Sequence, residues 1–259
     1  MLFKESILKA QNNSLSRHIP NMVTLCNLTI GVLAVIMALE NQVLIASWLI
    51  LLAGVLDFLD GFLARILNAA SPLGKQLDSF ADLVSFGMAP TAIAYKLMEY
   101  SIRGDIFYGG IQNTSLPERL LLFSPILLVL FAAMRLAEFN LRENSTEFIG
   151  LAVPAAAIWF AGGNLFLVHN MGTPASDFIL QPLVLLVNIV IISLLMIARI
   201  QMFSLKFHGF GWRSNQIRYI FLAISCILLI ILHEIALPVI ILLYLLLSIT
   251  LSLIRNNRK

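Results

Sequence analysis

Long apolar runs separated by short polar connections fill most of this chain. Eight runs approach or exceed the ~20 residues with which a helix crosses a bilayer. They cover residues 21–39, 43–67, 76–97, 119–139, 149–168, 180–202, 215–232 and 236–254. The pattern predicts an all-α fold, a polytopic membrane bundle of about eight transmembrane helices.

The composition supports a membrane protein. Of the 259 residues, 59% are hydrophobic and only 12% are charged, whereas a soluble domain carries about 25% charged residues. The formal charge of +3 is too small to indicate nucleic-acid binding. Cys26 and Cys226 lie inside apolar runs, where we expect them to be buried as small apolar side chains.

The chain divides into three parts. Residues 1–20 lack the continuous apolar core of a signal peptide, and they form either a short interfacial helix or a frayed cytoplasmic tail. Residues 21–207 form the expected catalytic transmembrane core, and residues 208–259 add two C-terminal transmembrane helices.

Positive charge in the connections predicts the orientation in the membrane. With the N-terminus in the cytoplasm, fourteen Lys and Arg residues fall on the inner side and three, Lys96, Arg103 and Arg119, on the outer side. Both termini are therefore expected in the cytoplasm. This layout fits a bacterial plasma membrane.

Four aspartates interrupt the second and third apolar runs. Asp57 and Asp60 are three residues apart, and Asp78 and Asp82 are four apart, so each pair shares one face of a helix. A carboxylate at membrane depth costs roughly 2.5–3.5 kcal/mol without a partner. Because Pro72 and Gly74 break the pattern between the two helices, the pairs can face each other around divalent cations, Mg²⁺ or Mn²⁺.

Small and basic residues follow the first aspartate pair. Gly61 and Ala64 leave room for a ligand beside the backbone, and Arg65 suits a phosphate or diphosphate. Carboxylates, metal and arginine together favour phosphoryl-type transfer. The alternative from another class is a cation-coupled transporter that uses the aspartates as an ion site.

The spacing of these residues resembles the signature of the CDP-alcohol phosphatidyltransferase family. The matching positions are Asp57, Asp60, Gly61, Ala64, Arg65, Gly74, Asp78 and Asp82. The resemblance implies a membrane helix bundle, a homodimer, and displacement of CMP from a CDP-linked lipid by an alcohol. It implies that the four aspartates hold two divalent ions and that Asp82 is also the base. Gly61, Ala64 and Gly74 would approach the cytidine, and Arg65 and Ser71 the phosphates.

Flanking segments are most similar to the phosphatidylserine synthases of that family. They are IPNMVTLCNLTIG (19–31), SFGMAP (85–90), GLAVPAAA (150–157) and ARIQMFSLKF (198–207). The resemblance implies that Asn21, Thr24 and Asn27 help bind CDP-diacylglycerol. We also expect an acceptor pocket at Ser85, Arg135, Asn140 and Lys206. The equal alternative for Arg135, Asn140 and Lys206 is that they are snorkelling or loop residues at the cytoplasmic ends of the spans. Glu138 departs from the family pattern, in which an arginine is usual.

The expected reaction is transfer of the phosphatidyl group from CDP-diacylglycerol to L-serine, giving phosphatidylserine and CMP. The same chemistry with glycerol 3-phosphate or inositol is the nearer alternative. An acceptor that carries a phosphate would need additional basic residues around the site, and this chain offers few, which favours serine.

Overall fold

The computed structural model describes residues 2–104, 115–141, 148–203 and 211–256. The described chain is helical almost throughout, and its helices are α1 (Leu2–Leu39), α2 (Val43–Ile66), α3 (Pro72–Asp82), α4 (Ala89–Arg103), α5 (Leu116–Phe123), α6 (Ile126–Leu141), α7 (Val153–His169), α8 (Pro174–Ile179), α9 (Pro182–Ile197), α10 (Trp212–Leu232) and α11 (Ala236–Asn256). A π-helical segment, η1 (Leu83–Met88), joins α3 to α4, and a 3-10 turn, η3 (His233–Ile235), joins α10 to α11. The two-residue strands β1 (Phe148–Ile149) and β2 (Gln201–Met202) pair antiparallel.

The all-α membrane bundle is confirmed. Within the described residues, four helical stretches are long and apolar enough to cross a membrane: His18–Leu39, Val43–Ile66, Leu116–Leu141 and Asn215–Leu253. Val153–His169 and Pro182–Ile197 are apolar but shorter. The third predicted span corresponds to the continuous rod α3–η1–α4, whose aspartates and charged end lower its hydropathy.

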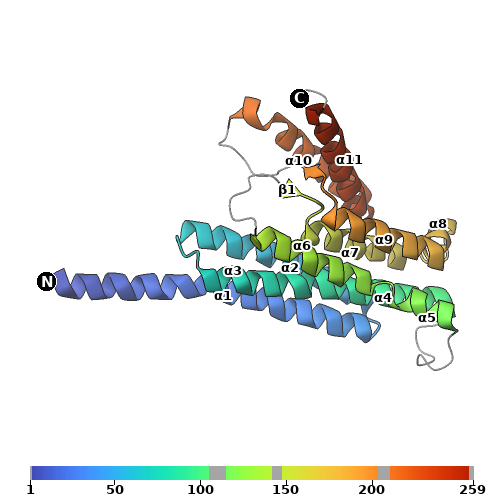
Figure 1. Cartoon of the computed structure of the whole chain (residues 1–259), viewed down its shortest axis with the longest axis horizontal. Coiled ribbons are helices and arrows are strands. Elements are labelled where there is room, and N and C mark those ends of the chain that lie inside the picture. Colours follow the sequence, from blue (N-terminus) through green and yellow to red (C-terminus); the bar gives the residue numbers. More distant parts are fainter. Residues whose placement is uncertain (1, 105–114, 142–147, 204–210, 257–259) are drawn as a thin grey trace.

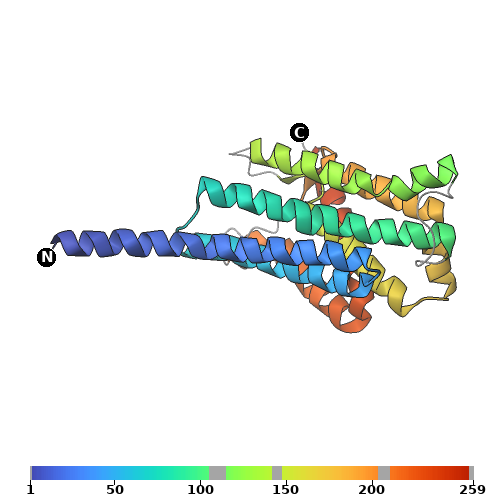
Figure 2. The same cartoon turned by 90° about the horizontal axis from the view of Figure 1, so that it is seen from below.

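Most of the helices run along one common axis, as Figures 1 and 2 show. The N-terminal part of α1 projects beyond the bundle, and α10 and α11 are inclined to the common axis. The α2–α3 turn lies at the same end of the bundle as this projection, whereas the α1–α2 turn and α8 lie at the other end (Figure 1). Residues 2–20 are thus helical and continuous with the first span.

Small residues allow the central helices to approach closely. Ala34 and Ala38 of α1 and Ala46 and Ala53 of α2 are fully buried. Gly31 of α1 lies so close to η1 that a Cβ there would be 2.2 Å from Ser85 Oγ and 2.8 Å from Ser85 Cα. The α1–α2–η1 contact therefore fixes the elements that carry the aspartates.

The outer faces of the bundle are apolar and exposed, as expected for a lipid-facing surface. Trp48, Phe58 and Leu183 are between 53% and 70% exposed. The prediction that Cys26 and Cys226 are buried is wrong, because both side chains are exposed on their helices. Sequence hydropathy does not separate a residue that faces lipid from one that faces another helix, since both are apolar.

Replacing Gly31 by alanine tests the α1–η1 contact. The added methyl group collides with the Ser85 backbone, and overpacking of this kind costs about 1–3 kcal/mol. We expect a lower apparent Tm in detergent and less monodisperse protein on size exclusion. Gly163→Ala on α7 is the matched control, because a Cβ at Gly163 meets no described atom within 4 Å. Equal melting temperatures for both variants would contradict the close contact.

Candidate active site

Local backbone chemistry builds the corner between α2 and α3. Asn68 adopts a left-handed conformation with φ of 48°, and the Ala69 N–H donates to the Ala64 carbonyl at 2.9 Å, which is a Schellman-type helix end. Ser71 then caps α3 by accepting from the Gly74 N–H at 3.0 Å, and Pro72 stands in the first turn of that helix. These caps reverse the chain, so that α2 and α3 both pack on α1 and face the same cavity.

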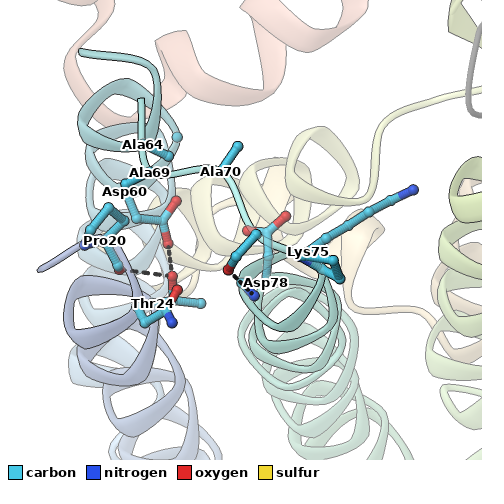
Figure 3. Close-up of a pocket in the computed structure, with 13 residues that line it drawn as sticks. Pro20, Thr24, Asp60, Ala64, Ala69, Ala70, Lys75 and Asp78 are labelled. Carbon is cyan, nitrogen blue, oxygen red and sulfur yellow. Dashed lines mark hydrogen bonds between the residues drawn. The ribbon is translucent and has the colours of Figure 1, made fainter. Parts of the chain in front are cut away.

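Three of the four aspartates meet at this corner. Asp57 and Asp60 of α2 and Asp78 of α3 each offer a carboxylate oxygen within 4.8 Å of the other two. The Thr24 hydroxyl of α1 donates to Asp60 Oδ2 at 2.7 Å, and the Pro20 carbonyl lies 3.1 Å from the same hydroxyl oxygen. Figure 3 shows Asp60 and Asp78 facing the same cavity from their two helices.

Asp82 lies next to this group, one turn further along α3. Its carboxyl group is close enough to that of Asp57 to interact with it directly. Asp82 Oδ1 is buried and has no hydrogen-bond partner among the described residues. Asp57 therefore connects Asp82 to the three clustered carboxylates.

The donor set fits hard divalent cations. It consists of carboxylate oxygens alone, which is the ligand type that Mg²⁺ and Mn²⁺ prefer. Several carboxylates so close together repel one another strongly unless a cation lies between them. Asp57, Asp60 and Asp78 can hold one ion together, and the buried Asp82 Oδ1 beside them has no hydrogen-bond partner among the described residues.

A cavity of about 560 Å³ opens beside the carboxylates. Its lining comes from α1, α2, the α2–α3 turn and α3, and comprises Pro20, Asn21, Thr24, Asp60, Gly61, Ala64, Ala69, Ala70, Ser71, Pro72, Gly74, Lys75 and Asp78. Among the residues predicted to bind the CDP-linked lipid, Asn21, Thr24, Gly61, Ala64, Ser71 and Gly74 lie in this wall. The wall also contains Lys75, which was not predicted as a site residue although it directly follows Gly74.

The two glycines of the wall have different roles. A Cβ on Gly61 would meet no described atom within 4 Å, so a side chain there would take up free space at the cavity. A Cβ on Gly74 would lie 2.9 Å from Asn21 Oδ1 and 3.1 Å from Ser71 Oγ. Gly61 thus leaves space for a ligand, whereas Gly74 allows α3 to approach α1.

Two other predicted lipid-binding residues lie outside the cavity wall. Arg65 is exposed near the end of α2. Asn27 is fully buried, and its Oδ1 accepts from the Ser85 hydroxyl at 3.0 Å. Its Nδ2 has no hydrogen-bond partner in the described chain.

The π-helical segment η1 brings α6 to the carboxylates. Gly87 lies against α6, where a Cβ would be 3.4 Å from Ala132 Cβ and 3.5 Å from Val129 Cγ2. Arg135 follows Ala132 by nearly one turn and lies within electrostatic range of Asp82. Its side chain is buried, its Nε has no hydrogen-bond partner among the described residues, and its guanidinium carbon is 5.3 Å from the Phe139 ring centroid.

The four residues predicted for the acceptor pocket have different surroundings. Arg135 lies beside the carboxylates, but Ser85 donates to Asn27 of α1. Asn140 joins α6 to α3, because its Nδ2 donates to Ser79 Oγ at 2.8 Å and its carbonyl accepts from Lys75 Nζ at 3.2 Å. Lys206 lies outside the described residues.

Glu138, the residue that departs from the family pattern, is exposed on α6. Arg135, three positions earlier, is only 9% exposed. The charge reversal at position 138 is therefore at the surface of the helix, where the Glu138 carboxylate is still within electrostatic range of the Arg135 guanidinium.

Metal binding can be tested directly by Mn²⁺ titration of the purified protein, with free Mn²⁺ followed by electron paramagnetic resonance. Asp57→Asn should weaken binding by more than about tenfold, since even residues that only orient metal ligands change affinity by such factors. Asp177→Asn is the control, because Asp177 is an exposed carboxylate on α8. Equal affinities for the two variants would show that the cluster holds no metal.

Comparisons with known proteins identify the family. A family model described as CDP-alcohol phosphatidyltransferase matches residues 17–230. A CDP-diacylglycerol–serine O-phosphatidyltransferase of Bacillus subtilis is 32% identical over 193 residues, which are 74% of this chain and 93% of that protein. Proteins of the same name are 35% identical over 142 residues in Helicobacter pylori, where the match spans 54% of this chain and 54% of the relative, and 34% identical over 144 residues in Methanocaldococcus jannaschii, covering 56% and 59%. With more than half of its length matched by the family model, this chain belongs to the CDP-alcohol phosphatidyltransferase family.

Proposed function

We propose that the chain transfers the phosphatidyl group of CDP-diacylglycerol to the hydroxyl of L-serine, forming phosphatidylserine and CMP. The observation that carries this proposal is the group of three carboxylates from α2 and α3 at the wall of a 560 Å³ cavity. The printed names of the relatives specify CDP-diacylglycerol and serine for those proteins, and this supports the same substrates here.

In this proposal the cavity binds the CDP group. Gly61 and Ala64 let the nucleotide approach the α2 backbone, and Asn21 and Ser71 offer polar groups at the opposite wall. Lys75 lies in the same wall beside Gly74, but its ammonium group donates to the Asn140 carbonyl of α6, so we assign it no contact with the diphosphate. The acyl chains remain in the lipid that surrounds the apolar outer faces of the bundle.

Asp57, Asp60, Asp78 and Asp82 would hold two Mg²⁺ or Mn²⁺ ions in the proposed enzyme. The ions supply charge neutralisation at the diphosphate, which is the main requirement of phosphoryl-type transfer. Thr24 orients Asp60 for this role by donating to its Oδ2. The hydrogen bond leaves the other carboxylate oxygen of Asp60 available.

Asp82 is the proposed base. It removes the proton from the serine hydroxyl while the hydroxyl oxygen attacks the phosphorus that bears diacylglycerol. A bond forms between this oxygen and the phosphorus, and the bond to the CMP oxygen breaks, so that CMP leaves as an anion. The reaction needs no covalent intermediate with the enzyme, since the described residues of the cavity wall include no cysteine or histidine and the Ser71 hydroxyl caps α3.

Arg135 is the proposed partner of the serine carboxylate. It is buried beside Asp82 and its Nε has no hydrogen-bond partner in the described chain. A buried guanidinium favours a carboxylate ligand, with which it forms charge-assisted hydrogen bonds. The Glu138 side chain is exposed on α6, so Arg135 is the residue to which we assign binding of the serine carboxylate. This arrangement favours serine over inositol, which has no carboxylate.

The proposal includes the setting of the enzyme. Both termini lie in the cytoplasm, serine enters from the cytosol, and CDP-diacylglycerol enters from the inner leaflet, as in a bacterial plasma membrane. The excess of Lys and Arg on that side supports this orientation. Two chains form a homodimer, as the family resemblance implies.

The decisive experiment measures CMP release by the purified protein in detergent with CDP-diacylglycerol and Mg²⁺. We expect release with serine, and none with glycerol 3-phosphate, with inositol or without an alcohol. A chelator should abolish the reaction, and Asp82→Asn should lower kcat by at least about 100-fold, since a positioned base contributes 10²–10⁴.

Three results would contradict parts of this proposal. Release with a different alcohol would retain the chemistry and reject serine. Activity that survives both the chelator and Asp82→Asn would reject the metal and the base. Absence of release with every alcohol tested, in protein that elutes as a single folded species, would reject phosphatidyl transfer.

Gly61→Ala tests whether CDP-diacylglycerol occupies the cavity. The methyl group has room in the protein alone but takes space that the nucleotide needs, so the fold should persist while the KM for CDP-diacylglycerol rises at least about tenfold, a loss within the 1–3 kcal/mol of an overpacked contact. Gly54→Ala on the same helix is the control, because its Cβ would lie 4.0 Å from Phe86 Cε1. A KM equal to that of the control would place the nucleotide elsewhere.

A further inference from the structure

The segment that follows Asp82 is wound as a π-helix. At the end of η1 (Leu83–Met88) the Ala89 N–H donates to the Val84 carbonyl, five residues earlier, where an α-helix would use the residue four positions earlier. Single π-helical turns inside α-helices are rare and often occur at functional sites. Because α3, η1 and α4 form one continuous rod, the position of η1 determines how the end of α3, which carries Asp82, is oriented.

Three consecutive residues of η1 face three different helices, and all three are buried. Ser85 faces α1, where its hydroxyl donates to a pair of Asn27 acceptors, the carbonyl oxygen at 3.1 Å and Oδ1 at 3.0 Å. Phe86 faces α2, since its Cε1 would lie 4.0 Å from a Cβ on Gly54. Gly87 lies against α6. The surrounding helices therefore hold η1 from three sides.

The contact with α1 is the polar one of the three. Ser85 and Asn27 are both fully buried. Gly31, about one turn after Asn27, leaves the space that Ser85 occupies, because a Cβ there would lie 2.2 Å from Ser85 Oγ. A buried hydrogen bond is costly to break, since the group left behind has no water to replace its partner. The bond between Ser85 and Asn27 thus fixes the rotation of η1 about its own axis.

Asp82 depends on its backbone for its position. It stands at the junction of α3 and η1, three residues before Ser85. Its Oδ1 is buried and accepts no hydrogen bond in the described part of the chain, whereas Asp60 is oriented by the Thr24 hydroxyl. A base must stay within hydrogen-bond reach of the proton that it removes. For Asp82 this requirement falls on the segment that carries it.

We propose that Ser85 is a positioning residue for Asp82. By bonding Asn27 it fixes the π-helical turn, and the fixed turn holds the Asp82 carboxylate where it meets the acceptor hydroxyl. This inference rests on the proposed function. It gives Ser85, which was expected in the acceptor pocket, a role in orienting the base, and it gives Asn27 a role inside the protein instead of at the lipid substrate.

The test compares Ser85→Ala with the wild type in the CMP-release assay. The substitution removes the hydroxyl and keeps the small side chain, so the protein should remain folded. We expect kcat to fall at least about fivefold, because misplacement of a reacting group by about 1 Å can cost 10²-fold. The KM values for serine and for CDP-diacylglycerol should stay within about twofold of the wild type, since the cavity wall and Arg135 are unchanged.

Ser193→Ala is the matched control. Ser193 of α9 is 1% exposed, and its Oγ has no hydrogen-bond partner among the described residues. The control therefore removes an equally buried hydroxyl that bonds no other helix, and it should keep the wild-type kcat. A kcat of Ser85→Ala equal to that of this control would overturn the proposal. So would a rise in the KM for serine at unchanged kcat, which would return Ser85 to the acceptor pocket.

A double-mutant cycle shows whether Ser85 acts through Asp82. In an Asp82→Asn background the orientation of the base no longer matters, so Ser85→Ala should change the residual kcat by less than about twofold. If Ser85 supported the fold in general, the substitution would lower kcat by the same factor in both backgrounds. That result would contradict the proposal.

Mn²⁺ binding supplies a readout that needs no turnover. Asp82 is also a proposed metal ligand, so Ser85→Ala should weaken the more weakly bound Mn²⁺ at least about threefold in the electron paramagnetic resonance titration, and Ser193→Ala should not. An Mn²⁺ affinity of Ser85→Ala equal to that of the control would reject the role of Ser85. Failure of the proposed function is distinguishable from this result, because it would appear in the wild type as absence of CMP release.

Discussion

This structure depends on one constraint, which is that a carboxylate at membrane depth is energetically unfavourable unless a cation or a hydrogen-bond donor partners it. One carboxylate oxygen each of Asp57, Asp60 and Asp78 lies within 4.8 Å of the other two. Mutual repulsion opposes this arrangement, and a shared cation stabilises it. The surrounding helices supply partners to these carboxylates and hold them in place. α1 supplies Thr24 as a donor to Asp60, the caps at Asn68 and Ser71 turn α2 into α3, and α6 brings a buried arginine to Asp82.

The part of the site that is local in sequence could be predicted. Helical spacing puts each aspartate pair on one face, and Pro72 and Gly74 mark the turn that makes the two helices neighbours. The helical bundle could be predicted as well, because the hydropathy of each span is also a local property of the sequence. Six of the eleven cavity-wall residues other than the aspartates were predicted, namely Asn21, Thr24, Gly61, Ala64, Ser71 and Gly74.

The rest of the site depends on which face of each helix packs against another helix. This choice could not be predicted, because lipid-facing and helix-facing positions are both apolar in the sequence. Ser85 and Asn140 were expected at the acceptor, yet Ser85 bonds α1 and Asn140 bonds α3. Arg65 is exposed, outside the cavity wall. The approach of α6 depends on Gly87 and Ala132, two small residues among many in the chain.

The proposed nucleotide side and the proposed acceptor side of the site are built from different elements. The nucleotide side is made by α1, α2, the turn and α3, so its geometry follows from short-range capping and helical spacing. The proposed acceptor side is assembled from η1 and α6, which approach each other closely at Gly87 and Ala132. Changes in α6 can therefore alter the acceptor while the carboxylates and the cavity keep their geometry. Glu138 lies on the exposed face of α6, but its carboxylate is within electrostatic range of the Arg135 guanidinium, so the substitution at this position acts on the proposed acceptor side and leaves the carboxylate cluster unchanged.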